Sequence, residues 1–321
     1  MISIYVHQNG ETNSASRVDP AWLDPASEVT LWVDLSTPGP DEGRLLSDVF
    51  HFHPLSVEDA LSAIHHPKIE PYPGYLYLIL HGIDFDNRQS GFATRDVDFF
   101  LGRNYLVTVH DGGSRSIARW KELCDHHERI LGEGPAALMH RIVDTMVENY
   151  RPAIDALEDQ IDELEEAAIV GRRPHLVREI LALKRDLGSL RRVVLPQRDA
   201  VGRLARREFP QINDEITYRF RDVYDHFVRL SEEAMLFQDR VTSILDAHLS
   251  AVSNRLNVVV KVLTVISTIF LPLTVLTGMW GMNIPLPMFP GAEGAQFWWV
   301  AGVMIAIAAA MLAVFRWNRW I

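Results

Sequence analysis

The sequence predicts an α/β domain at the N-terminus, a long helical stalk, and two C-terminal helices that span a membrane. Three observations predict this class. Short apolar runs alternate with turn clusters in the first third of the chain, residues 211–271 contain neither glycine nor proline, and residues 297–315 carry no charge. We expect six parts: an α/β domain over 1–135, a helical hairpin over 136–210, a stalk helix that continues into the first span over 211–279, a loop over 280–296, a second span over 297–317 and a tail over 318–321.

The N-terminal part is predicted to contain strands with short helices between them. Turn clusters such as Pro38-Gly39-Pro40 and Asp111-Gly112-Gly113 separate its apolar runs. The expected strands are Ile2–Val6, Val29–Leu35, Tyr75–Ile83, Val97–Leu101 and Tyr105–Val109. No phosphate-binding glycine loop, nucleophile elbow or zinc-protease motif occurs in the chain. We therefore expect no active site and no enzyme.

The pattern becomes helical over residues 136–207. Apolar residues recur at helical spacing from Ile154 to Leu164, and an arginine-rich segment follows Pro174. The remaining face of the first arm carries seven acids, Asp155, Glu158, Asp159, Asp162, Glu163, Glu165 and Glu166. The turn at Gly171–Pro174 predicts an antiparallel hairpin with an acidic and a basic arm. The acids form either a solvated face or a surface that concentrates divalent cations.

A long helix is predicted to begin after Pro210. Asn213 is a suitable N-cap, and Asp214 and Glu215 place negative charge in the first turn, where the helix dipole favours it. Roughly 65 helical residues at about 1.5 Å each reach about 100 Å, some three times a bilayer core of ~30 Å. One helix can therefore serve as both cytoplasmic stalk and membrane span.

Basic residues orient the two spans. Arg255 and Lys261 lie at the start of the first span and Arg316 and Arg319 follow the second, whereas the loop between them contains one ionisable residue, Glu293. The positive-inside rule places both termini in the cytoplasm. The first ten residues lack the features of a signal peptide, so we expect the C-terminal hairpin to direct insertion into the lipid membrane.

The composition excludes two classes of partner or site. The net charge of −11 argues against nucleic acid and suits a body that attracts cations. The single cysteine, Cys124, excludes an internal disulfide and a thiolate-rich metal centre.

One face of the long helix is small or polar although half of it lies at membrane depth. Its members are Asp246, Ser250, Ser253, Asn257, Val260, Thr264, Ser267, Leu271, Thr274 and Gly278. Lipid offers no partners to hydroxyls and amides, so this stripe should face protein or water. It is either a packing seam between two helices or the wall of a pore, and a pore requires several copies of a chain with only two spans. No carboxylate lies in either span, which suits a cation that keeps much of its water, such as Mg²⁺.

The end of the first span resembles the CorA family of divalent-cation channels. The similar residues are Gly281-Met282-Asn283 after Lys261–Thr274, and the resemblance covers nearly the whole chain, including His53–Ala60, Phe100–Thr108 and Phe220–His226. It implies a funnel-shaped homopentamer in a bacterial inner membrane. It also implies transport of Mg²⁺ or Co²⁺ through a pore lined by the first span, with no cofactor other than the transported or regulatory cation.

The resemblance implies roles for individual residues. Gly281, Met282 and Asn283 would form the selectivity filter. The residues implied to line the pore are Asn257, Val260, Leu263, Thr264, Ser267, Leu271, Thr274 and Gly278, with Leu263 as hydrophobic gate. Val260 stands where family members often carry methionine, so its shorter side chain would narrow the constriction less.

Asp222 matches a family carboxylate that binds regulatory Mg²⁺ between subunits. Asp84 and Asp86, after the third expected strand, are candidates for its partner. Charge supports the idea independently, because five chains carry 5 × (−11) = −55 and would repel one another unless cations bridge them.

Two alternatives to Mg²⁺/Co²⁺ transport stay open. The loop Ile284–Gly294 lacks the acidic sequence common after this motif in magnesium members and is closer to the ZntB branch, whose members are associated with proton-coupled zinc uptake. Neither span contains cysteine or histidine, the ligands that favour zinc. The other alternative is a membrane-anchored scaffold, which would have no use for Thr264, Ser267 and Thr274 on one face.

Overall fold

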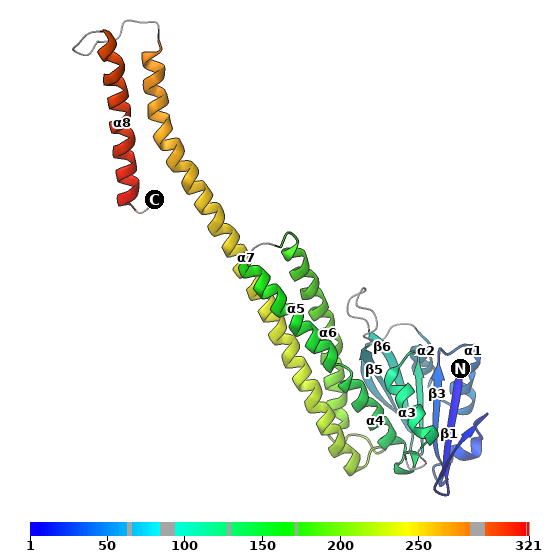
Figure 1. Cartoon of the computed structure of the whole chain (residues 1–321). Helices are drawn as coiled ribbons and strands as arrows, with labels where there is room; N and C mark the ends of the chain where they lie inside the picture. The colour runs from blue at the N-terminus through cyan, green and yellow to red at the C-terminus, as the bar shows by residue number, and fades with distance from the viewer. Residues whose placement is uncertain are drawn as a thin grey trace. The chain divides into compact units, whose positions relative to one another are not determined.

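The structure is a computed structural model that describes residues 1–62, 66–83, 94–126, 130–170, 173–282, 293–318 and 320. It consists of two compact units, residues 1–245 and residues 246–321. Helix α7, Asp214–Trp280, is continuous and contributes residues to both units (Figure 1).

A seven-stranded sheet forms the centre of the first unit, with strand order β2-β1-β3-β7-β6-β5-β4. Strands β3 and β7 are parallel, and all other neighbours are antiparallel. The strands are β1 Ile2–Gln8, β2 Glu11–Ala15, β3 Thr30–Ser36, β4 Lys68–Tyr72, β5 Tyr75–Ile83, β6 Thr94–Leu101 and β7 Tyr105–His110. The central strands are apolar on both faces because helices cover both sides of the sheet.

Two of these strands were not expected from the sequence, and both lie at the edges of the sheet. Strand β2 is polar except for Ala15, and β4 contains Pro71, which sequence patterns place in a turn. An edge strand tolerates proline because its missing N–H can face away from the neighbouring strand. The two edge strands therefore lack the apolar runs that identify the inner strands.

Each face of the sheet has its own apolar core. On one face lie α1 Pro40–Arg44, the π-helical turn η2 Leu45–Val49 and α2 Pro54–Leu61, whose Leu46 and Val57 pack with Tyr77 and Phe100. The short 3₁₀ helix η1, Pro20–Leu23, lies near this core through partly buried Trp22. The opposite face is covered by α3 Arg115–His126, the 3₁₀ turn η3 Leu131–Glu133 and α4 Pro135–Glu148.

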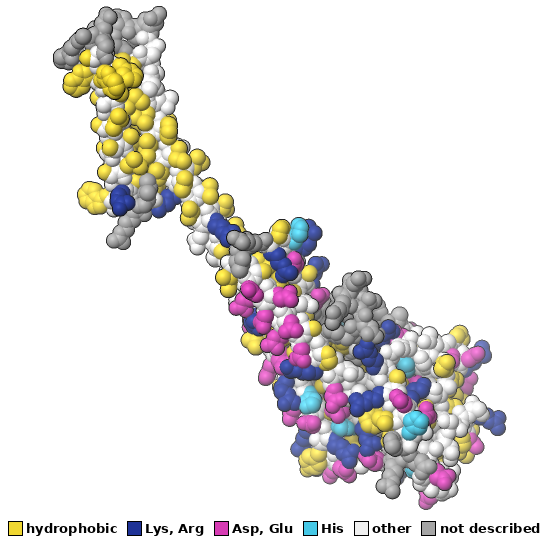
Figure 2. Space-filling model, in the orientation of Figure 1, with side chains coloured by type: hydrophobic (Ala, Val, Ile, Leu, Met, Phe, Trp, Pro, Cys, Tyr) yellow, Lys and Arg dark blue, Asp and Glu magenta, His cyan; other side chains and the backbone are white. Residues whose placement is uncertain are grey.

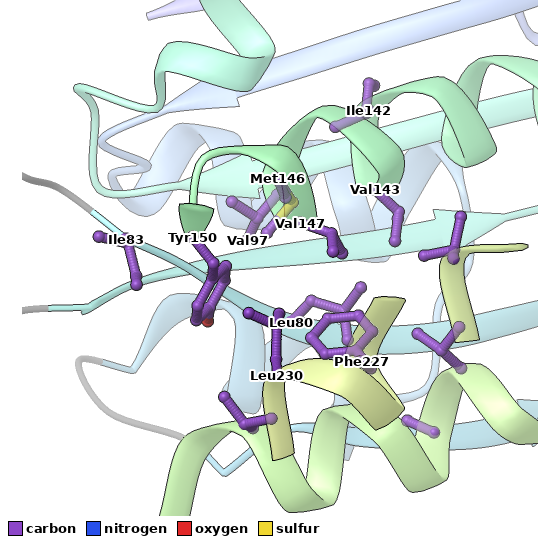
Figure 3. Packing of buried hydrophobic residues seen from close by; sticks show 14 of the residues in the cluster. Leu80, Ile83, Val97, Ile142, Val143, Met146, Val147, Tyr150, Phe227 and Leu230 are labelled. Atoms are coloured by element: carbon purple, nitrogen blue, oxygen red, sulfur yellow. The ribbon is translucent and has the colours of Figure 1, made fainter. Parts of the chain in front are cut away.

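The second core continues from the sheet into the helical arms. Leu80, Met146, Tyr150 and Phe227 belong to one buried cluster that joins β5, α4 and α7 (Figure 3). Helices α5 Arg151–Val170 and α6 Leu176–Leu204 extend this cluster along α7. The first half of α7 is thus held in the same hydrophobic core as the sheet.

The acidic arm, α5, is linked by ion pairs to α7. Arg240 of α7 donates to Asp162 and Glu165 at 2.6 and 2.8 Å. At the start of the arm, Arg151 pairs with Asp155 and with Glu233 of α7. Among the described residues, the acids of α5 form ion pairs with these two arginines and none with an arginine of α6.

The second unit consists of the C-terminal part of α7 and of α8, Glu293–Trp317. Both helices are long and apolar enough to cross a membrane. Apolar side chains gather over this unit, whereas charged side chains dominate the surface of the first (Figure 2). Helix α8 is partly covered along one face, through Gln296, Val300, Met304, Ile307, Met311 and Phe315.

Candidate functional site

The polar stripe predicted from the sequence is an exposed face of α7. The residues predicted to line the pore, which are the stripe residues from 257 to 278 and Leu263, are all exposed: Asn257, Val260, Leu263, Thr264, Ser267, Leu271, Thr274 and Gly278. The covered residues of α7 in this unit are Lys261, Val265, Ile269, Pro272, Leu273 and Leu276. At about 100° per residue, the centre of the stripe lies roughly 150° around the helix from the centre of the covered face. The stripe therefore points away from α8 and is available to other copies of the chain or to water.

Leu263 lies to one side of this stripe. Its helical position is roughly 65° from the centre of the stripe, and its side chain is 62% exposed. Helical periodicity does not place Leu263 on the stripe. Only the family resemblance identifies Leu263 as a pore residue.

The threonine hydroxyls on the stripe use their only hydrogen within the helix and offer only lone pairs to their surroundings. Thr264 Oγ1 donates to the carbonyl of Val260 at 2.8 Å, and Thr274 Oγ1 donates to the carbonyl of Phe270 at 2.8 Å. Because each hydroxyl has one hydrogen, its outward-facing lone pairs can only accept. The water shell of a cation presents hydrogens to its surroundings, so such a surface suits a hydrated cation and disfavours an anion.

The same bonding occurs off the stripe. Thr268 Oγ1 donates to the carbonyl of Thr264 at 2.7 Å, and Thr277 Oγ1 donates to the carbonyl of Thr274 at 3.0 Å. Bonding a hydroxyl to the preceding turn satisfies its donor in an apolar medium, wherever the residue points. Thr264 and Thr274 therefore differ from Thr268 and Thr277 in their position on the stripe and not in their hydrogen bonding.

Helix α7 ends at the predicted filter motif. The backbone N–H of Gly281 donates to the carbonyl of Thr277 at 2.9 Å, and that of Met282 donates to the carbonyl of Met279 at 3.3 Å. A Cβ on Gly281 would lie 3.2 Å from the Thr277 oxygen, a contact that favours glycine. Asn283 lies outside the described residues.

Asp222 is exposed on the first half of α7, within the first unit. The Nε2 atom of His226, one turn later, lies 4.0 Å from Asp222 Oδ2. Both predicted partners, Asp84 and Asp86, fall outside the described residues. Within the described part of the chain, no group of three or more histidine, cysteine, aspartate or glutamate side chains is placed to hold a metal. Asp222 would therefore need ligands from elsewhere, such as a neighbouring copy.

The base of α7 near Asp222 is fixed by an ion network. Glu133 of η3 pairs with Arg141 of α4 and, at 3.1 Å, with Arg219 of α7, and Arg219 also pairs with Glu215. Sequence reasoning did not identify this network, because the pair that joins η3 to α7, Glu133 and Arg219, is 86 residues apart in the chain. Only Glu215 and Arg219 have the local i,i+4 spacing of a helix.

A buried polar network at the end of β5 also escaped prediction. It joins the backbone of His81 to Tyr150 and Gln197, both of which have no exposed surface. The available signal was a glutamine in the apolar register of an arginine-rich helix, directly after Pro196.

Comparisons with known proteins agree over most of the chain. The family model that describes CorA-like Mg²⁺ transporter proteins matches residues 27–317. The protein YfjQ of Bacillus subtilis is 34% identical over 90% of this chain and 89% of its own length. The cobalt/magnesium transport protein CorA of Thermotoga maritima is 30% identical over 92% of this chain and 84% of its own length.

A solved structure shares the fold. The CorA magnesium transporter of Methanocaldococcus jannaschii has a TM-score of 0.84 to this chain and 22% identity, covering 100% of this chain and 99% of that one. This likeness confirms the predicted fold class, an N-terminal α/β domain followed by a long helical stalk and two C-terminal apolar helices.

Proposed function

Since the chain belongs to the family of CorA-like Mg²⁺ transporter proteins, we propose that it carries divalent cations across a membrane through a pore lined by α7. Its family is one of transporters and not of enzymes. The observation that carries the proposal is the stripe on α7. It is polar at membrane depth, lies opposite the covered face of the helix, and presents hydroxyl oxygens that accept hydrogen bonds.

The pore is formed by five copies of the chain around a common axis. Two spans cannot enclose a channel, so cyclic repetition is required, and the 3.5-residue period of the stripe suits identical helices packed about one axis. The family resemblance supports five. Both termini lie in the cytoplasm of a bacterial cell, and the transport domain lies in the inner membrane.

Within this pore, the roles follow the order of residues along α7. Asn257 lies near the cytoplasmic end, Val260 and Leu263 form the narrow apolar section, and Thr264, Ser267, Leu271, Thr274 and Gly278 line the remaining wall. Gly281, Met282 and Asn283 form the outer filter, where a ring of asparagine side chains meets the hydrated ion.

Cytoplasmic cations regulate the pore through Asp222. A bridging Mg²⁺ between Asp222 and a carboxylate of the α/β domain, with Asp84 and Asp86 as candidates, would reduce repulsion among five acidic chains. Occupied bridges hold the ring closed, and depletion of Mg²⁺ releases it.

Mg²⁺ or Co²⁺ is the proposed substrate. Support comes from the oxygen-rich lining, from the absence of cysteine and histidine in both spans, and from the name of the Thermotoga maritima relative, a cobalt/magnesium transport protein. The sequence of the loop Ile284–Gly294 favours a second candidate, ZntB-like Zn²⁺ transport coupled to protons.

Ion flux into liposomes that contain the purified protein tests both proposals. Entry of Mg²⁺ and Co²⁺ without a pH gradient supports the first, and Zn²⁺ entry that requires an inward proton gradient supports the second. Absence of flux for all three ions would favour the scaffold.

A further inference from the structure

The backbone of His81 is bound by two buried side chains from distant parts of the first unit. The N–H of His81 donates to Gln197 Oε1 at 2.9 Å, and the hydroxyl of Tyr150 donates to the carbonyl of His81 at 2.7 Å. Gln197 Nε2 donates to the Tyr150 hydroxyl at 2.9 Å and closes a ring of hydrogen bonds. Gln197 and Tyr150 are fully buried, so none of these groups can exchange its partner for bulk water.

The ring continues the sheet past the end of its edge strand. Pairing between β4 and β5 runs from Tyr72–Tyr75 to Lys68–Ile79, and His81 lies beyond the last of these pairs. Its N–H and C=O would otherwise be buried without a strand partner, at a cost of about 1–3 kcal/mol each. The amide of Gln197 and the hydroxyl of Tyr150 take the place of the missing strand.

Through this ring, the end of β5 is joined to three helical elements. Gln197 belongs to α6, and Tyr150 lies between α4 and α5. The aromatic ring of Tyr150 also contacts that of Phe227 of α7 edge to face, with ring centroids 6.3 Å apart (Figure 3). Strand β5 ends two residues later, at Ile83, and Asp84 follows directly in the chain.

The direction of each bond makes the ring specific for a neutral amide. The His81 N–H is a donor, so the glutamine oxygen must face it and the glutamine nitrogen must face Tyr150. Burial raises the pKa of Tyr150, so its hydroxyl keeps its single proton, which the His81 carbonyl accepts. Tyr150 therefore needs a donor from residue 197. An ionised glutamate there has none, whereas a protonated glutamate does.

We propose that Gln197 is a positioning residue for the control of transport by cytoplasmic cations. Through Tyr150 and the His81 backbone, it holds the end of β5 in a fixed position against α6 and α7. This inference rests on the proposed regulation through Asp222, which lies on α7 five residues before Phe227, the residue that Tyr150 contacts. Loosening the ring lets this end of the strand move and weakens cation inhibition.

Gln197→Glu in the full-length protein tests the proposal, because a buried glutamate has a pKa raised toward ~8–9 and can be switched. Channels in planar bilayers are measured at about pH 6 and about pH 9, with Mg²⁺ added on the side of the cytoplasmic domain. We expect the half-inhibitory Mg²⁺ concentration of the variant to match wild type at the lower pH. At the higher pH it should be about tenfold above wild type, as expected for one lost buried hydrogen bond.

Gln238→Glu is the matched control. Gln238 lies in α7 and its side-chain oxygen accepts from Arg191 at 3.3 Å, a bond that glutamate retains. It should show no pH-dependent change relative to wild type. Comparison with wild type at each pH also removes contributions from other titratable groups near the ring, the His81 imidazole and its ion-pair partner Asp96.

Two further variants keep the proposal falsifiable if Gln197→Glu does not assemble. Gln197→Met and Tyr150→Phe remove hydrogen bonds without adding charge, and both should raise the half-inhibitory concentration at either pH in protein that elutes as a single assembled species. If such variants lose thermal stability but keep wild-type inhibition, the ring is only structural and the inference is wrong. If wild type conducts but is not inhibited, the proposed regulation fails and this inference fails with it.

Discussion

The hydroxyl of Tyr77 donates a hydrogen bond to Asp98 Oδ1 inside the sheet, where Asp98 is only 5% exposed. The nearby cation, Lys68, is bound to Asp59 and Glu70 instead. Burial, the largest cause, and the neighbouring charge of Asp96 therefore raise the pKa of Asp98 to about 7. A carboxyl group in the central sheet of the first unit thus changes charge near neutral pH.

Asp98→Asn should remove a pH-dependent loss of stability. Because the pKa of Asp98 is higher in the folded protein than in the unfolded chain, the unfolded chain binds fewer protons between these two values. The stabilising contribution of protonated Asp98 is full below pH ~4 and is lost as the pH rises through about 7. Between about pH 5.5 and about pH 8.5, wild type should lose about 2 kcal/mol relative to the variant.

Thermal unfolding of both proteins across this range provides the measurement. Asparagine retains the shape of the side chain and can accept from Tyr77, so the variant serves as its own structural control. Parallel melting curves for wild type and variant would show that Asp98 does not titrate in this range.

Thr264→Val should reduce cation flux about tenfold, because valine keeps the shape of the side chain and removes the acceptor that faces the stripe. Thr268→Val is the matched control, since Thr268 makes the same bond to the preceding turn but lies off the stripe. Stopped-flow uptake into liposomes distinguishes them. An equal loss of flux in both variants would mean that the hydroxyls stabilise the helix and do not interact with the permeating ion.

Asp222→Ala should weaken inhibition by cytoplasmic Mg²⁺ while leaving maximal flux intact. Removal of one carboxylate ligand from each of five interfaces should raise the half-inhibitory concentration by roughly fivefold or more. Asp239→Ala, which removes an exposed carboxylate elsewhere on α7, controls for the change in net charge. Unchanged inhibition in Asp222→Ala would remove this residue from the regulatory site.

The sequence predicted those parts of the fold whose signals are local. Helix α7 follows from its N-cap and from the absence of glycine and proline over 211–271, and the inner strands follow from apolar runs. Proline-containing β4 carries no such signal, because an edge strand needs no apolar run. Likewise the stripe was visible because one helix carries all of it. The ring of His81, Tyr150 and Gln197 was not, because three segments distant in sequence supply its bonds.

The most direct test of the proposed pore is uptake of Mg²⁺ into liposomes by Asn283→Ala, compared with wild type and with Asn254→Ala. Asn254 is an exposed asparagine of α7 that lies off the stripe. We predict that Asn283→Ala abolishes or strongly reduces uptake and that Asn254→Ala transports like wild type. Wild-type uptake by Asn283→Ala would contradict a filter at the end of α7 and, with it, the pore proposed here.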